Sequence, residues 1–454
     1  MDNFNLNNYN RVYFCGILGV SMQGLAKHCL LLGKKISGSD ANCSAIEVFD
    51  KNVLISSGLS LKNIKKFQPD LVVYSSAISL THKELIYAKK KNIKTIKRSE
   101  LLGEILKLGS KSIAVSGCHG KTTITAMLAH VLYSANIKFT AFIGGDDTFF
   151  GNYFSNGYDF VLTEACEFKK NFLDLSPNYC IVSNIDDDHQ DSFVDMQDRI
   201  STFKKFIDGK VAIINDDDIN SNSLKHFTSV SIGIKNKAQY CAKNLQLISP
   251  TLSMFSLYCG NRYLCKITLN VGGLYNIYNA LSCCALCCSL NIDVKYIKKG
   301  LKSFCGVKRR LQNIGKIQDC EVIIDYAHHP TEIACVLDNL KITEKDLVVF
   351  QPHTYSRTKC LMDSFVKVLG TVKNLVIYKT YPAREKFDRL GDFTTLYNNI
   401  CNGNNSVKLI KTQANLIKYF TKKINFDRII FLGAGDMPNK IQKIINSKKR
   451  LKNV

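Results

Sequence analysis

The stretch SGCHGKTT, Ser116–Thr123, stands between a strand-like run at Lys111–Val115 and a helix-like run at Ile124–Tyr133. A glycine turn that opens onto a helix presents unpaired backbone N–H groups to an anion, and the helix dipole adds to the attraction. In such a loop, Lys121 lies along the β- and γ-phosphates of a nucleotide and the Thr122 hydroxyl ligates Mg²⁺. The stretch therefore predicts a phosphate-binding loop.

The loop follows the short form of the motif, G-x-x-G-K-T. The longer Walker A pattern requires a glycine at the position where this chain has Val115. The alternative is a chance Gly-x-x-Gly pair in a surface turn. The order of strand, loop and helix favours the phosphate site.

The chain's bulk composition is that of a globular protein with two to four domains. It has 454 residues, of which 46% are hydrophobic and 22% charged. No apolar stretch is long enough to cross a bilayer, and the polar start of the chain lacks the pattern of a signal peptide. We expect a cytoplasmic protein without a membrane partner, in which the 18 cysteines are reduced thiols.

The net charge is +23, from 61 Lys+Arg against 38 Asp+Glu. Either a phosphate-rich partner or a solvated lysine surface explains this balance. The basic residues are spread along the chain, and no RNP-like motif or zinc-finger spacing accompanies them. We therefore expect no nucleic-acid partner.

Three segments restart the same alternation of strands and helices, so we expect an α/β protein with three domains. Residues 1–107 predict a Rossmann-like parallel sheet, residues 108–310 a central mixed sheet of the P-loop ATPase type, and residues 311–454 a second Rossmann-like domain. In the first segment, Gly16-x-x-Gly19 and Asp40 form half of a dinucleotide fingerprint. A nucleotide-binding turn and a simple strand–helix turn both remain open there.

Acidic and histidine residues follow two strands of the central segment. Glu164 ends a predicted strand at Phe160–Glu164, and His189 follows another at Tyr179–Ser183. The carboxyl ends of parallel strands gather at one edge of a sheet, beside the phosphate loop. Mg²⁺ prefers oxygen ligands, so a hydroxyl and one carboxylate suit it, and His189 fits a second metal position. Asp186–Asp188 are interpreted as a solvated turn.

Two strand ends of the third segment carry histidine and arginine, in IIDYAHHPTEI (Ile323–Ile333) and VFQPHTYSRT (Val349–Thr358). Such an edge is suited to carboxylates and phosphates. The cysteines of LSCCALCCSL (281–290) have no second Cys/His pair at zinc spacing, and the run is helical, so we interpret them as packing residues.

Taken together, these motifs resemble those of the Mur ligase family, and the resemblance extends almost from end to end of the chain. The matching motifs are SGSD (37–40), YSSAI (74–78), RSELL (98–102), GCHGKTT (117–123), EACE (164–167), SNIDDDH (183–189), the pair Asn276/Asn279, GVKRR (306–310), DYAHHPTEI (325–333), FQPHTYSRT (350–358), PAREK (382–386) and GAGDM (433–437). The resemblance implies that ATP and Mg²⁺ drive the joining of L-alanine to UDP-N-acetylmuramate through an acyl phosphate. It implies successive domains for the sugar nucleotide, ATP and the amino acid, in a monomer or weak homodimer.

The resemblance also implies a role for individual residues. The catalytic set is Lys121, Glu164, His189 and His328. The ATP-binding set is Gly117, Cys118, His119, Gly120, Lys121, Thr122, Thr123, Asn276, Asn279, Arg310 and Asp325. The sugar-nucleotide set is Gly16, Gly19, Ser21 and Ser76. The amino-acid set is Tyr326, His328 and Arg357, and the metal set is Thr122, Glu164 and His189.

Four positions depart from the commonest pattern of the family. Leu18 stands in place of a glycine, Tyr275 in place of a histidine, and Thr354 where some members carry an extra arginine. Cys166 belongs to a variant of the acid-rich motif. Two rivals to the implied function remain, a ligase that recycles a whole peptide and a decayed homologue that acts as a basic binding protein.

Overall fold

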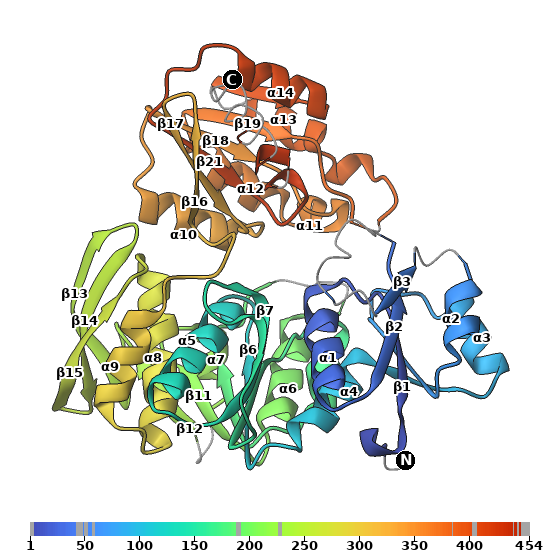
Figure 1. Cartoon of the computed structure of the whole chain (residues 1–454). Coiled ribbons are helices and arrows are strands. Elements are labelled where there is room, and N and C mark those ends of the chain that lie inside the picture. The colour runs from blue at the N-terminus through green and yellow to red at the C-terminus, as the bar shows by residue number, and fades with distance from the viewer. Residues whose placement is uncertain are drawn as a thin grey trace, which may run out of the picture. The chain divides into compact units, whose positions relative to one another are not determined.

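The computed structural model describes residues 4–41, 49, 53–56, 60–187, 192–225, 229–383, 385–401, 406–438, 440–442 and 445. Two compact units divide the chain. The first holds residues 1–246, 254–270 and 276–305, and the second holds residues 247–253, 271–275 and 306–454. Figure 1 labels many of the helices and strands of both units. The boundaries near residues 108 and 311 stay predictions.

The first sheet is parallel, with strand order β3-β2-β1-β4-β5. Its strands are β1 (Arg11–Cys15), β2 (Lys35–Ser39), β3 (Leu54–Ser56), β4 (Leu71–Tyr74) and β5 (Lys94–Lys97), and its helices are α1 (Val20–Leu31), α2 (Lys62–Phe67), α3 (Lys83–Lys90) and α4 (Arg98–Leu106). The apolar runs of β1 (RVYFC) and β4 (LVVY), which are almost entirely buried, suit the interior of a parallel sheet, because its central strands are covered on both faces. The predicted Rossmann-like sheet is confirmed.

A ten-stranded mixed sheet, most of which belongs to the first unit, has the order β15-β14-β13-β12-β11-β10-β6-β9-β7-β8. The strands are β6 (Lys111–Ser116), β7 (Phe139–Asp147), β8 (Gly151–Ser155), β9 (Phe160–Glu164), β10 (Tyr179–Val182), β11 (Val211–Asn215), β12 (Ser229–Gly233), β13 (Tyr240–Ser249), β14 (Leu252–Cys259) and β15 (Arg262–Leu269). The helices are α5 (Lys121–Ser134), α6 (Met196–Ile207), α7 (Ile219–Asn222), α8 (Leu274–Ser289) and α9 (Val294–Ser303). The predicted mixed sheet is confirmed.

One hydrophobic core is shared by these two sheets. It runs from Val12 and Phe14 of β1, through Leu101 of α4, to Val161 of β9 and Phe203 of α6, all of them buried. This continuity explains why the two sheets belong to one compact unit.

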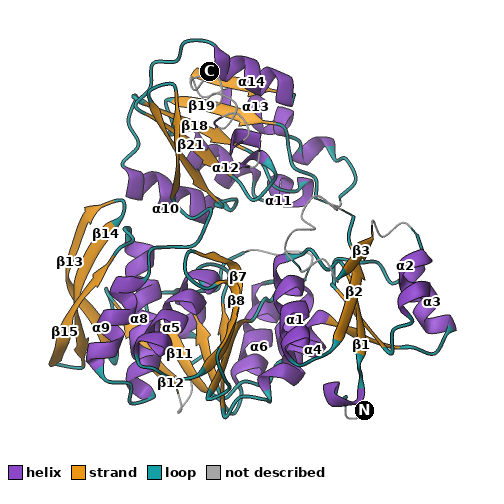
Figure 2. Ribbon diagram, in the orientation of Figure 1, coloured by secondary structure: helices purple, strands orange, loops and turns teal. Residues whose placement is uncertain are grey.

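The second unit contains a six-stranded sheet in the order β16-β17-β21-β18-β19-β20. In the described part of this sheet, β16 pairs antiparallel with β17, and the other strand pairs are parallel. The strands are β16 (Gln312–Ile317), β17 (Cys320–Asp325), β18 (Asp346–Phe350), β19 (Asn374–Tyr378), β20 (Ser406–Ile410) and β21 (Arg428–Leu432), and the helices are α10 (Pro330–Leu340), α11 (Tyr355–Cys360), α12 (Met362–Leu369), α13 (Phe393–Cys401) and α14 (Gln413–Thr421). Helices flank the strands in all three sheets (Figure 2), so the predicted α/β class is confirmed.

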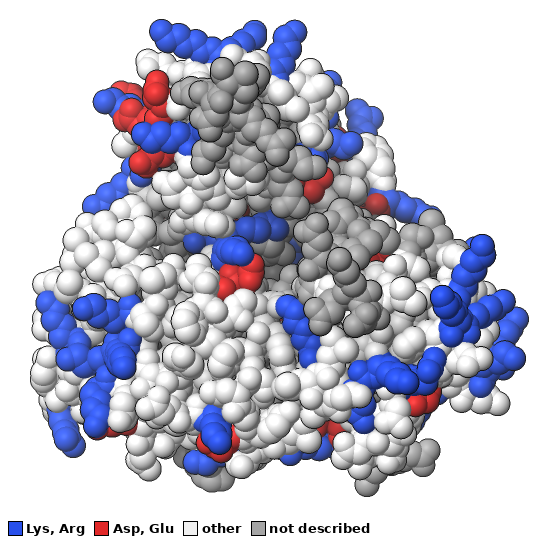
Figure 3. All heavy atoms as spheres, in the orientation of Figure 1, with Lys and Arg blue, Asp and Glu red and all other residues white. Residues whose placement is uncertain are grey.

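On the face shown in Figure 3, Lys and Arg side chains lie in several separate groups. None of the described helices combines the length and apolar character that a bilayer crossing requires. In α8, Cys283, Cys284 and Cys287 are buried, as the packing interpretation expects.

Candidate functional site

The phosphate loop connects β6 to α5. Its two glycines adopt left-handed conformations, with φ of +120° at Gly117 and +86° at Gly120. A Cβ atom at Gly117 would collide with the Ser183 hydroxyl, and one at Gly120 would collide with the Asn279 side chain. The loop therefore requires glycine at both positions for its backbone angles and for space.

The substitution Gly117→Ala is expected to weaken ATP binding by at least about tenfold, because the left-handed backbone and the collision each cost on the order of 1 kcal/mol. Isothermal titration calorimetry of the purified protein with ATP measures the change in affinity. Gly209→Ala is the matched control, since Gly209 also has a positive φ, +67°, but an added Cβ meets nothing within 4 Å. An unchanged ATP affinity in Gly117→Ala would contradict the assignment of this loop.

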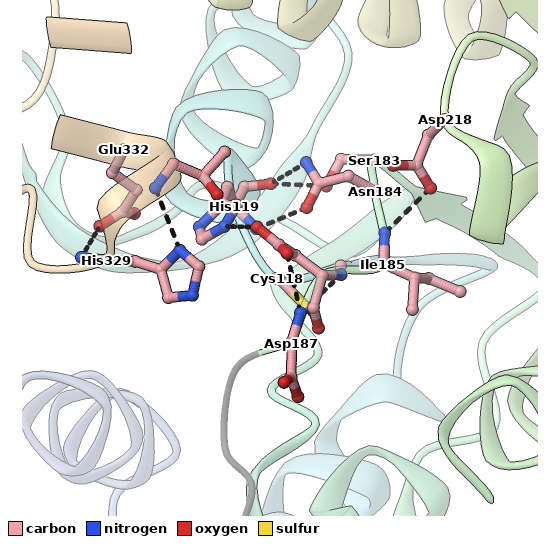
Figure 4. A network of polar contacts seen from close by, with 12 residues as sticks. Cys118, His119, Ser183, Asn184, Ile185, Asp187, Asp218, His329 and Glu332 are labelled. Atoms are coloured by element: carbon pink, nitrogen blue, oxygen red, sulfur yellow. Dashed lines mark hydrogen bonds and ion pairs between the residues drawn. The ribbon is translucent and has the colours of Figure 1, made fainter. Parts of the chain in front are cut away.

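The loop following β10 supports the phosphate loop. Asn184 accepts hydrogen bonds from the amides of Cys118 (3.1 Å, to its backbone oxygen) and His119 (2.9 Å, to its side chain). The Ser183 hydroxyl donates to the His119 carbonyl at 2.6 Å. Figure 4 shows these side chains around the loop.

This support changes the expected role of Cys118 and His119. Their amides are already engaged by Asn184, whereas the first bond within α5 runs from the Ile124 amide to the Gly120 carbonyl. The helix itself therefore does not use the amides of Lys121, Thr122 and Thr123, which are available to an anion. The helix also begins at Lys121, three residues before the predicted run.

Lys121 lies across the mouth of the loop. Its Nζ donates to the carbonyls of Gly117 (2.5 Å) and Cys118 (3.1 Å), and it forms an ion pair with Glu167 at 3.1 Å. Burial lowers the pKa of Lys121, but the Glu167 carboxylate and other nearby acidic groups outweigh it, so that the pKa is raised overall. The lysine is therefore cationic and held in place.

Glu167 is the residue that the sequence analysis missed. Its side chain is fully buried, and a buried carboxylate needs a cation of this kind as its counter-ion. The signal was present, since Glu167 is the second acid of the EACE motif, three residues after Glu164.

Glu164 lies beside the loop because β9 pairs with β6, with Glu164 opposite Val115. Its Oε1 accepts a hydrogen bond from the Gly144 amide of β7 at 2.5 Å. The sheet thus brings Glu164 to the edge where α5 begins with Thr122. A hydroxyl and a carboxylate at this edge are oxygen donors of the kind that Mg²⁺ takes. His189, the third predicted metal ligand, lies outside the described residues.

Asn276 and Asn279 are buried on α8, and the Asn279 amide donates to the Asn276 side-chain oxygen at 3.3 Å. Asn279 also abuts Gly120. Asn279 therefore lies against the phosphate loop, and the role of the pair toward adenine stays a prediction.

The predicted sugar-nucleotide residues lie at the carboxyl edge of the first sheet. Gly16, with φ +83°, donates to the Ser39 carbonyl at 2.7 Å, and Gly19 is the N-cap of α1. Asp40 accepts the Leu18 amide at 3.0 Å, so this acid shapes the loop. At the same edge, the Ser21 hydroxyl accepts a hydrogen bond from Arg98, and the Ser76 hydroxyl donates one to Asn171.

In the second unit, Asp325 is buried and accepts the amides of Leu311 and Ala327, each at 2.7 Å. Burial raises the pKa of Asp325. The guanidinium of Arg310 lies over the Tyr326 ring, 5.2 Å from its centroid. Asp325 therefore fixes the turn that carries Arg310 and Tyr326, and direct nucleotide contact by either charged residue stays a prediction.

Tyr326, His328 and Arg357 are brought together through His353. The centroid of the His328 ring lies 5.3 Å from that of Tyr326 and 5.5 Å from that of His353. Arg357 Nη1 lies 3.2 Å from His353 Nδ1. His328 is also 3.2 Å from Glu332, which caps the start of α10 near His329 (Figure 4). This cluster supplies a cation and hydrogen-bonding rings at the carboxyl ends of β17 and β18.

The phosphate loop with its charged lysine, on an α/β framework of three sheets, defines an ATP-dependent enzyme. The chain matches the Mur ligase family, catalytic domain over residues 11–109, the Mur ligase middle domain over 115–287, and the Mur ligase, glutamate ligase domain over 309–435. It belongs to the Mur ligase family.

Curated relatives cover nearly the whole chain. A UDP-N-acetylmuramate–L-alanine ligase of Clostridium acetobutylicum is 39% identical over 444 residues, which are 94% of this chain and 95% of that protein. One of Acetivibrio thermocellus is 36% identical over 451 residues, covering 95% and 94%. The crystal structure of a UDP-N-acetylmuramate-alanine ligase from Thermotoga maritima is similar with a TM-score of 0.83 and 25% identity, covering 97% of this chain and 99% of that one.

Proposed function

We propose that this protein joins L-alanine to UDP-N-acetylmuramate in peptidoglycan precursor synthesis, with conversion of ATP to ADP and phosphate. The observation that carries the proposal is the similarity to ligases named for this reaction over 94% of the chain. The phosphate loop with a cationic Lys121, and the Tyr326–His328–Arg357 cluster, supply the chemistry that the reaction needs.

A carboxylate does not react with an amine at a useful rate, because an oxide would have to leave. An oxygen of the muramyl carboxylate attacks the γ-phosphorus of ATP, the bond from that phosphorus to the β–γ bridging oxygen breaks, and ADP leaves. The alanine amine then attacks the acyl carbon, phosphate departs with one former carboxylate oxygen, and the amine loses a proton. The protein contributes mainly positioning and neutralisation of charge.

The scheme gives roles to predicted residues in three parts of the site. Lys121 neutralises the γ-phosphate, and Thr122 and Glu164 hold Mg²⁺, which draws electron density from the phosphate oxygens when bound. Gly16, Gly19, Ser21 and Ser76 form the sugar-nucleotide edge. Arg357 pairs with the alanine carboxylate. We assign the reaction to the cytoplasm, where ATP is available, and to a monomer or weak homodimer.

A phosphate-release assay tests the function. Purified protein with ATP and Mg²⁺ should release phosphate only when UDP-N-acetylmuramate and L-alanine are both present. Oxygen-18 placed in the muramyl carboxylate should appear in the released phosphate. Faster release with a tripeptide than with L-alanine would identify a recycling ligase instead, and no release with either would indicate a binding protein.

A further inference from the structure

Arg98 lies at the carboxyl edge of the first sheet, where the predicted sugar-nucleotide residues lie. It is the first residue of α4 and follows β5 directly. Because all strands of this sheet are parallel, the ends of β1, β4 and β5 meet at the same edge. The guanidinium donates from Nη1 to the hydroxyl of Ser21 at 2.7 Å, which places it beside the start of α1.

The charge of Arg98 has no ion-pair partner among the residues that the structure describes. The Ser21 hydroxyl is the side chain that accepts from it there. By contrast, Lys121 pairs with Glu167 and Arg428 pairs with Asp346. A guanidinium carries five N–H donors and stays charged in proteins. Most of the donors of this partly buried side chain are therefore available to a ligand.

The same edge meets the segment that follows β9 of the central sheet. The Ser76 hydroxyl donates to Asn171 at 3.1 Å, Lys169 Nζ donates to the Ser76 carbonyl at 2.9 Å, and the Ser99 hydroxyl donates to Asp174 at 2.6 Å. The segment after β9, from Lys169 to Asp174, therefore packs against the edge at which Arg98 lies.

Electrostatic contacts give the same placement. Burial lowers the pKa of Arg98, while Cys166, Glu164 and Asp174 act in the opposite direction. Cys166 and Glu164 also act on Lys121. Arg98 and Lys121 therefore both lie near the segment that contains Glu164 and Cys166.

We propose that Arg98 binds the lactyl carboxylate of UDP-N-acetylmuramate and positions it for attack on the γ-phosphorus. This inference rests on the proposed function. The carboxylate is the group that must lie between the sugar nucleotide and the γ-phosphate, and a planar guanidinium matches its two oxygens. The contact also selects the muramyl acid over the parent N-acetylglucosamine nucleotide, which lacks the lactyl group.

Calorimetric binding of two ligands tests this assignment. UDP-N-acetylmuramate and UDP-N-acetylglucosamine share the uridine, the pyrophosphate and the sugar ring, and differ by the lactyl carboxylate. In Arg98→Met the affinity for the muramyl nucleotide should fall by about tenfold to a hundredfold, the effect of one charged hydrogen-bonded contact. The affinity for the glucosamine nucleotide should change by less than about threefold on the same reasoning. Lys107→Met is the control, because Lys107 follows α4, is exposed, and pairs only with Glu104 among the described residues.

Each outcome decides the assignment. Equal losses for both nucleotides would place Arg98 at the pyrophosphate or in the fold, and would overturn the proposal, as would unchanged binding of both. Retained binding of the glucosamine nucleotide shows that the variant is folded. If the unsubstituted protein binds the muramyl nucleotide but releases no phosphate with L-alanine, the proposed function fails while the carboxylate contact can still be measured.

Discussion

The substitution Lys121→Ala is expected to lower the kcat of ligation by at least about a hundredfold. This loss corresponds to roughly 3 kcal/mol of transition-state stabilisation. Lys121 is held at the loop by two carbonyls and by Glu167, so the charge is preorganised for the γ-phosphate. Steady-state phosphate release with saturating substrates measures the effect.

The same substitution should also destabilise the fold, because it removes the Lys121 ammonium from its ion pair with the buried Glu167 carboxylate. Breaking a buried pair in this way costs about 3–5 kcal/mol. The double substitution Lys121→Ala with Glu167→Gln serves as the control, since it removes both charges. It should recover most of the free energy of unfolding, as measured by urea denaturation, and none of the activity. Activity of Lys121→Ala within a few-fold of the unsubstituted protein would rule out the phosphate assignment.

The second large effect is expected for Arg357→Ala, which should raise the KM for L-alanine by roughly tenfold to a hundredfold, the effect of a charged hydrogen bond. The KM for ATP should change far less, since Arg357 is assigned to the amino-acid carboxylate. Its position is fixed by His353, whose Nδ1 lies 3.2 Å from Nη1. Initial rates with each substrate varied in turn separate the two constants.

Lys359→Ala is the matched control for Arg357→Ala. Lys359 lies on the same short helix, is also basic, and its ion pair with Asp388 is exposed. Exposed pairs of this kind contribute little. An alanine KM that stays the same in Arg357→Ala would remove this residue from the pocket.

The strands that carry the site could be predicted from the sequence, because apolar runs and glycine turns mark them locally. The predicted strand at Phe160–Glu164 is found with the same bounds. The start of α5 lies within three residues of the predicted one. The predicted strand at Val211–Asn215 also agrees with the structure.

The β7–β8 hairpin was not predicted. Its first strand contains Gly144 and Gly145 followed by two aspartates, a composition typical of turns. Gly144 is needed there because the Glu164 carboxylate lies against it. The EACE motif marks Glu167 as an acid near Glu164, but its pairing with Lys121 depends on how the segment after β9 folds back on the loop, which the motif does not show. Contacts between distant segments leave no periodic signal.

The core common to the first two sheets has a thermodynamic consequence. Val12 and Phe203, far apart in the chain, belong to one buried cluster, so neither sheet can melt without exposing apolar surface of the other. A ligand held at either edge therefore raises the melting temperature of both sheets together. Occupancy by the sugar nucleotide should thus slow amide hydrogen exchange in α6, although that helix packs on the central sheet, because Phe203 of α6 belongs to the shared cluster.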